Sequence, residues 1–155
     1  MDQNILPKKI KIAIFLMLAT GVLAFIQFVL IISMAKMLLN QTHSSQYNVF
    51  SVILANFEIL LVAILFIVFA YFLKKRKKWA WFAAIVILLR EIVNGIKSIP
   101  LFFSPQGFGF MKYIPPSVST LFLIITIISV LGYILILISL ILLILERKNY
   151  WQVAL

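Results

Sequence analysis

Arg90 and Glu91 are adjacent ionisable residues near the middle of a long apolar stretch of the chain. An ionisable side chain at the centre of a bilayer costs at least about 2.5–3.5 kcal/mol on insertion scales. Such residues therefore face protein, water or a bound partner, and they mark ion pathways, proton relays and ligand sites. The pair is the strongest indication of a functional site in this sequence.

The small and polar residues around this pair share one side if the stretch is helical. At about 100° per residue, Asn94 and Lys97 fall in the same arc as Arg90 and Glu91, and the opposite side is aliphatic. Small residues let membrane helices approach closely, so we expect the polar side to face other helices and the aliphatic side to face lipid. Lys97 lies near the outer end and can extend to the outer headgroups.

Glu58, in the preceding apolar stretch, is expected at nearly the same depth. With a rise of about 1.5 Å per residue, Arg90 lies about 16 Å and Glu58 about 22 Å from the cytoplasmic ends of their helices. If all are ionised, the acids Glu58 and Glu91 balance the bases Arg90 and Lys97. Charge balance is what a buried ionic network requires, because an unpaired buried charge is strongly destabilising.

The first and last apolar stretches carry further polar residues at this level. We therefore predict a buried polar network, or an ion or ligand site, formed by Gln27, Glu58, Arg90, Glu91, Asn94, Ser129 and Tyr133. The half of each helix nearer the cytoplasm is expected to be dry and packed with Leu, Ile and Ala.

The composition indicates a membrane protein. Of 155 residues, 65% are hydrophobic and 12% are charged, with mean hydropathy +1.17, whereas a soluble domain is about half apolar and about a quarter charged. Apolar stretches cover residues 12–35, 49–73, 79–99 and 118–145, and each reaches the ~20 residues needed to cross a ~30 Å hydrocarbon core as helix. We predict an all-α fold: one integral membrane domain over residues 1–155, with four transmembrane helices in an antiparallel bundle.

Basic residues predict the orientation of these helices. One cluster is the short loop of Lys74, Lys75, Arg76, Lys77 and Lys78, and others flank the first and last spans. An even number of spans places these clusters on one side, which the positive-inside rule assigns to the cytoplasm together with both termini. The outer loops are then residues 36–48 and 100–117. We expect the plasma (cytoplasmic) membrane, with the basic loop contacting anionic headgroups.

Residues for enzymatic chemistry are scarce. The chain has no cysteine, its sole histidine, His43, lies in an expected outer loop, and Asp2 is its sole aspartate. Nucleophilic catalysis, haem ligation and metal binding all lack the side chains they need at depth. We expect no catalytic residue, no metal and no cofactor. The basic residues cluster at span ends, which indicates topology and not nucleic-acid binding.

Several interpretations of the polar network remain open, and the residues identify no known family. The favoured one is a non-catalytic accessory membrane component whose network holds the helices together. An alternative is a small ion- or proton-coupled transporter or channel subunit that uses Glu58 and Arg90. Docking of a charged helix, in a homo-oligomer or larger membrane complex, and a membrane enzyme of unknown type are weaker alternatives. A cavity that reaches Glu58 would favour transport, and a sealed network would favour a structural role.

Overall fold

The computed structural model describes residues 6–42, 49–102 and 116–153, and within these ranges the regular structure is helical, with no strand. Four of the helices (α1, α3, α4 and α6 in the order below) are long and apolar enough to cross a membrane, which confirms the all-helical class and the number of candidate spans. Along the chain the elements are α1 (Lys8–Thr42), α2 (Val49–Ala55), α3 (Phe57–Lys74), α4 (Lys78–Phe102), α6 (Pro116–Leu145) and α7 (Arg147–Val153).

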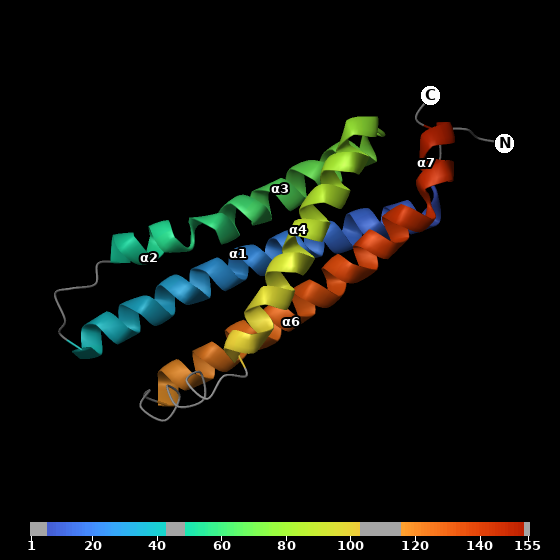
Figure 1. Ribbon diagram of the computed structural model, residues 1–155. Helices are drawn as coiled ribbons and strands as arrows, with labels where there is room; N and C mark the ends of the chain where they lie inside the picture. The colour runs from blue at the N-terminus through green and yellow to red at the C-terminus, as the bar shows by residue number, and fades with distance from the viewer. Residues whose placement is uncertain (1–5, 43–48, 103–115, 154–155) are drawn as a thin grey trace.

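Helix α1 lies at the centre of the assembly. It packs extensively against both α3 and α6. Helix α4 begins beside the C-terminal end of α3 and crosses to the N-terminal end of α6, so α3 and α4 diverge along their length (Figure 1). This divergence determines how the polar residues of α3 and α4 can meet.

A short turn over residues 75–77 connects α3 to α4. Arg76 adopts the left-handed conformation with φ 58°, and Lys77 N–H donates to the carbonyl of Phe72 at 3.1 Å. This closure resembles the helix-ending motif in which glycine usually occupies the left-handed position, so a non-glycine residue is held there at some cost in backbone strain. The turn fixes the angle at which α4 leaves α3.

The second apolar stretch, expected to be one helix over residues 49–73, is interrupted at Asn56. The Asn56 backbone N–H and its Nδ2 both donate to the carbonyl of Val52, at 3.1 and 2.9 Å. An asparagine side chain that competes for a backbone carbonyl disturbs the regular helical ladder. The candidate span in this stretch is therefore α3 alone, with 18 residues. Hydropathy did not reveal the break because one polar residue barely changes the average of a long apolar window.

Two helices extend several residues beyond the limits predicted for their spans. Helix α1 continues to Thr42 and α4 continues to Phe102. The length of an apolar stretch in the sequence reflects the thickness of the hydrocarbon core that it crosses, and not the full length of the helix. The rest of the expected outer loops, residues 43–48 with His43 and residues 103–115, lies outside the described part of the chain.

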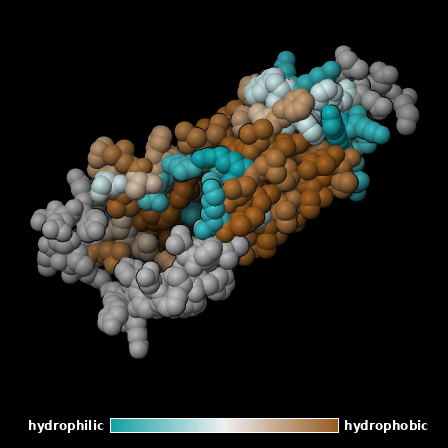
Figure 2. Space-filling view, viewed as in Figure 1, coloured by the Kyte–Doolittle hydropathy of each residue, from teal (hydrophilic) through white to brown (hydrophobic). Residues whose placement is uncertain are grey.

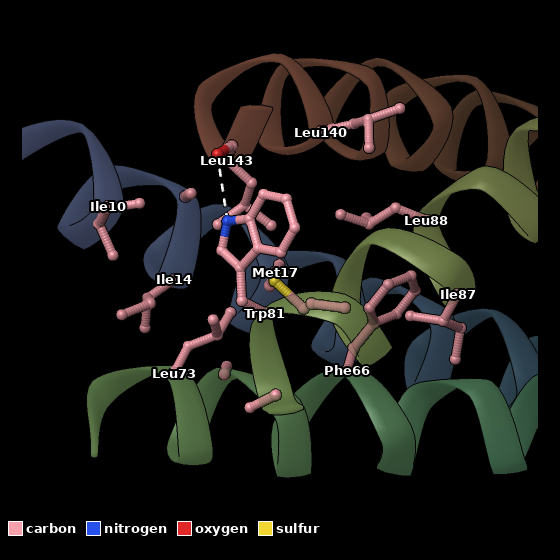
Figure 3. Close-up of a cluster of buried hydrophobic side chains, with 14 of the residues drawn as sticks. Ile10, Ile14, Met17, Phe66, Leu73, Trp81, Ile87, Leu88, Leu140 and Leu143 are labelled. Carbon is pink, nitrogen blue, oxygen red and sulfur yellow. Dashed lines mark hydrogen bonds between the residues drawn. The ribbon is translucent and has the colours of Figure 1, made fainter. Parts of the chain in front are cut away.

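A dense apolar core occupies the end of the helices where α3 turns into α4. Trp81 lies inside it, and its indole Nε1 donates to the carbonyl of Leu143 at 3.2 Å (Figure 3). Because lipid tails are as apolar as these side chains, such packing stabilises helix association through close van der Waals contact. The sequence predicted that this half of the bundle, nearer the basic loop, would be dry. Around Trp81 lie Ile10, Ile14, Met17, Phe66, Leu73, Ile87, Leu88, Leu140 and Leu143.

Helix α7 covers this end of the core. Glu146, 7% exposed at the junction of α6 and α7, accepts a hydrogen bond from Asn149 at 2.6 Å and pairs with Lys9 at 3.2 Å. The Asn149 hydrogen bond, with support from Lys9, lowers the pKa of Glu146 against the opposing effect of desolvation. Tyr150 is also buried and donates to the carbonyl of Lys77 at 3.1 Å. Nothing in the sequence alone indicated a role for Glu146.

A matched pair of glycines tests the contact between α4 and α6. A Cβ added at Gly95 would lie 2.6 Å from Cε1 of Tyr133, whereas one added at Gly132 meets nothing within 4 Å. We expect Gly95→Ala to lower the free energy of unfolding by about 1–3 kcal/mol, as overpacking does. Gly132→Ala should leave it unchanged or slightly raised, since alanine favours helix. Thermal unfolding in a non-ionic detergent measures both, and equal melting temperatures would contradict this contact.

Candidate functional site

A cavity of about 500 Å³ lies among the four long helices, next to the apolar core. Phe66 and Ile136 belong to both the core and the cavity wall. The volume falls within the ~300–1,000 Å³ typical of small-molecule sites. The polar side chains that line the cavity are Thr20, Gln27, Glu58, Glu91, Asn94, Lys97, Ser129 and Tyr133.

The structure brings most of the predicted polar set to this cavity, although the residues come from four helices. Arg90 is absent from the lining but bonds to two residues that form it. Lys97, expected to extend toward the outer headgroups, lines the cavity, and so does Thr20, which the predicted set omitted. The predicted members in the lining are Gln27, Glu58, Glu91, Asn94, Ser129 and Tyr133.

Arg90 joins carboxylates from two helices. Its Nη2 is ion-paired with Oε1 of Glu58 on α3, and its Nη1 donates to Oε1 of Glu91 on α4 at 3.2 Å. A guanidinium suits this role because its planar fork presents several N–H donors in fixed directions. Glu58 lies in the first turn of α3, directly after the break at Asn56. The positive end of the helix dipole there favours a negative charge.

This ion pair is more exposed than the sequence analysis expected. The side chains of Arg90 and Glu58 are 47% and 58% exposed, whereas that of Glu91 is 15% exposed. The cause is the divergence of α3 from α4, which leaves their facing residues only partly covered. Hydrophilic residues border a hollow in the otherwise hydrophobic surface on the side where α4 lies (Figure 2). The Arg90–Glu58 pair therefore lies at the edge of the site, and Glu91 lies deeper.

Lys97 does not complete the expected charge balance through direct contact. Among the described residues, the ion pairs of this region join Arg90 to Glu58 and to Glu91, and none includes Lys97. The four charged residues that were expected to balance one another therefore separate into two parts. Arg90, Glu58 and Glu91 form an ion-paired group with formal charge −1. The ammonium of Lys97 lies elsewhere on the cavity wall. Both signs of charge are presented to one cavity.

Hydroxyl groups complete the polar wall. Thr20 donates its hydroxyl hydrogen to the carbonyl of Leu16 at 2.9 Å, and Ser129 donates to the carbonyl of Ile125 at 2.8 Å. With that hydrogen engaged, each oxygen keeps lone pairs that can accept a hydrogen bond. These two oxygens therefore add acceptors to the cavity, and no new donors.

Comparison with known proteins assigns no relative: the chain matches no protein-family model, and neither a curated protein nor a solved structure is significantly similar to it. Within residues 6–42, 49–102 and 116–153, no group of three or more His, Cys, Asp or Glu side chains is placed to hold a metal ion. The chemistry of the cavity itself is therefore the basis for a functional argument.

The role of Arg90 can be tested by a double-mutant comparison. Arg90→Gln leaves two carboxylates near each other without their shared cation, so we expect the free energy of unfolding to fall by about 1–3 kcal/mol. Adding Glu58→Gln removes one of these carboxylates and should recover part of the loss. Lys97→Gln, on the same helix, is the control and should change little. If Arg90→Gln unfolds like the wild type in non-ionic detergent, the ion pair does not stabilise the helices.

Proposed function

We propose that this chain is a small multi-pass protein of the plasma (cytoplasmic) membrane. Its four long helices form an antiparallel bundle, with both termini and the 74–78 segment on the cytoplasmic side. The proposal is supported by contacts that gather the basic segments at one end: Lys9 pairs with Glu146, and Tyr150 bonds to the carbonyl of Lys77. Basic residues collected at one end of the spans are typical of the cytoplasmic face.

Anionic headgroups of the inner leaflet are the proposed partners of this basic end. Lys75 lies 4.6 Å from the ring centre of Tyr71, and Lys78 lies 5.6 Å from that of Trp151. Aromatic rings beside cationic side chains suit the headgroup region, where one part of a side chain is apolar and another is polar. This arrangement would hold the helices at a fixed depth.

We propose further that the cavity binds a small polar ligand or ion, as a transporter or channel subunit does, without chemical conversion. The observation that carries this proposal is a cavity of about 500 Å³ that reaches Glu58 and presents charges of both signs. A network serving only to join helices would be sealed and fully paired. Glu58 is the candidate ion or proton carrier, and Arg90 supplies its counter-charge.

A non-catalytic accessory role is the second candidate. It is favoured by the ion pair between Arg90 and Glu58, which connects α3 and α4 where the two helices diverge. A half-exposed charged pair within apolar spans is costly unless something covers it. In this alternative a second copy of the chain, or another member of a membrane complex, would supply the cover.

The orientation can be tested with single cysteines because the natural chain contains none. We expect a membrane-impermeant maleimide to label Ser45→Cys, in the expected outer loop, on intact cells. Lys75→Cys, in the α3–α4 turn, should be labelled only after the cells are permeabilised. The reverse pattern would contradict the proposed orientation, and labelling of both on intact cells would mean that α3 does not cross the membrane between them.

The ligand-binding proposal requires a hydrated cavity. Gly132 lines the cavity with open space around it, whereas Val130 on the same helix is 53% exposed on the outer surface. A thiol reacts as the thiolate, which forms only where water or polar groups stabilise the charge. We therefore expect N-ethylmaleimide to label Gly132→Cys several-fold faster than Val130→Cys in membranes. Equally slow labelling would mean a dry cavity and would refute this function.

A further inference from the structure

We infer that the cavity receives the cationic head of an amphiphile, which enters sideways from the bilayer between α3 and α4. This inference rests on the proposed ligand-binding function and names the class of ligand. The charge of the cavity, its hydrogen-bond acceptors and the apolar surroundings of its mouth all favour such a ligand.

The ion-paired group of Arg90, Glu58 and Glu91 at the mouth of the cavity can bind one more cation. Arg90 contacts Oε1 of both Glu58 and Glu91. This leaves the second oxygen of each carboxylate without an ion pair among the described residues and gives the group a formal charge of −1. Lys97 lies six residues from Glu91 on the same helix, about 9 Å along the axis. A positive head placed beside Glu91 would neutralise the group, whereas a negative head there would meet a net negative charge.

The cavity wall is also rich in acceptors. Besides the two carboxylates, the hydroxyl oxygens of Thr20 and Ser129 can accept because their hydrogens are engaged by helix carbonyls. The side-chain amides of Gln27 and Asn94 each offer an acceptor as well. Acceptors arranged around carboxylates suit an ammonium or another N–H donor.

The mouth opens through an apolar surface. Leu61 lies one turn from Glu58 on α3 and is 43% exposed, and Val93 lies one turn from Arg90 on α4 and is 48% exposed. Both belong to candidate membrane spans, so lipid tails would surround them. A ligand entering here needs an apolar part that can lie along these residues while its head occupies the cavity. That requirement defines an amphiphile.

The test uses the whole protein in phosphatidylcholine nanodiscs, with binding to empty nanodiscs subtracted. We expect tritiated dodecylammonium to bind saturably, one molecule per chain. Methylammonium, which has the head without the tail, should compete at least about tenfold more weakly, and so should dodecyl phosphate, which has the same tail with a negative head. Together these ligands separate the contribution of charge from that of the apolar tail.

Variants identify the carboxylate that receives the head. Glu91→Gln should weaken binding of dodecylammonium at least about tenfold, since a charged partner is lost. Glu91→Asp keeps the charge and should bind within a few-fold of the wild type, which separates loss of charge from loss of fold. Lys97→Gln removes a positive charge from the cavity wall and should raise the affinity. Glu146→Gln, an acid remote from the cavity, is the matched control and should bind normally.

Several outcomes would overturn the inference. Equal binding of methylammonium would mean a ligand taken from water, and stronger binding of dodecyl phosphate that depends on Lys97 would mean an anionic head. A Glu91→Gln variant with wild-type affinity would remove the charge argument. If none of the probes binds while Gly132→Cys still reacts readily with N-ethylmaleimide, the inference fails and the ligand-binding function stands. If Gly132→Cys is unreactive, the function itself fails.

Discussion

The crossing of α4 over the other helices is the constraint on which the rest of this structure depends. Two contacts hold α4 against α6: the Trp81 indole bonds to the Leu143 carbonyl near one end, and Tyr133 packs directly over Gly95 near the other. The tight turn at Arg76 places the start of α4 beside α3. The contacts with α6 then direct the rest of α4 away from α3. Because α4 cannot pack against both α3 and α6 along its whole length, space remains between α3 and α4. The cavity and the exposed ion pair are direct consequences of this geometry.

The same four helices form an apolar half and a polar half, and the first supports the second. Close packing around Trp81, with α7 and the buried Glu146 covering the end, fixes the helices in the apolar half. The polar half contains a cavity and a half-exposed ion pair, both of which reduce packing and expose charge. Sites that bind ligands commonly have less than the best possible packing and are stabilised by other parts of the fold. Packing in the apolar half therefore holds the four helices together although the polar half contains a cavity.

Helical periodicity and depth predicted which polar residues would meet, because both depend only on local geometry. Gln27, Glu91, Asn94 and Tyr133 line one cavity although they come from three different helices. The exposure of Arg90 and Glu58 could not be predicted in this way, since it depends on the angle between α3 and α4, which packing against α6 determines. The helix break at Asn56 was missed because hydropathy averages over a window. Glu146 was missed because a residue just after a span gives no periodic signal, and its partner Lys9 is distant in sequence.

The break at Asn56 and the shared guanidinium of Arg90 act together on Glu58. The break places Glu58 in the first turn of α3, where the positive end of the helix dipole favours its charge. Arg90 adds a second favourable interaction but divides it between two carboxylates, so neither is fully neutralised. A charged group that is stabilised yet incompletely paired, and only half covered, can gain from a further cation that also excludes lipid from it. Affinity for a cationic head would then arise from the exposure that the crossing of α4 creates.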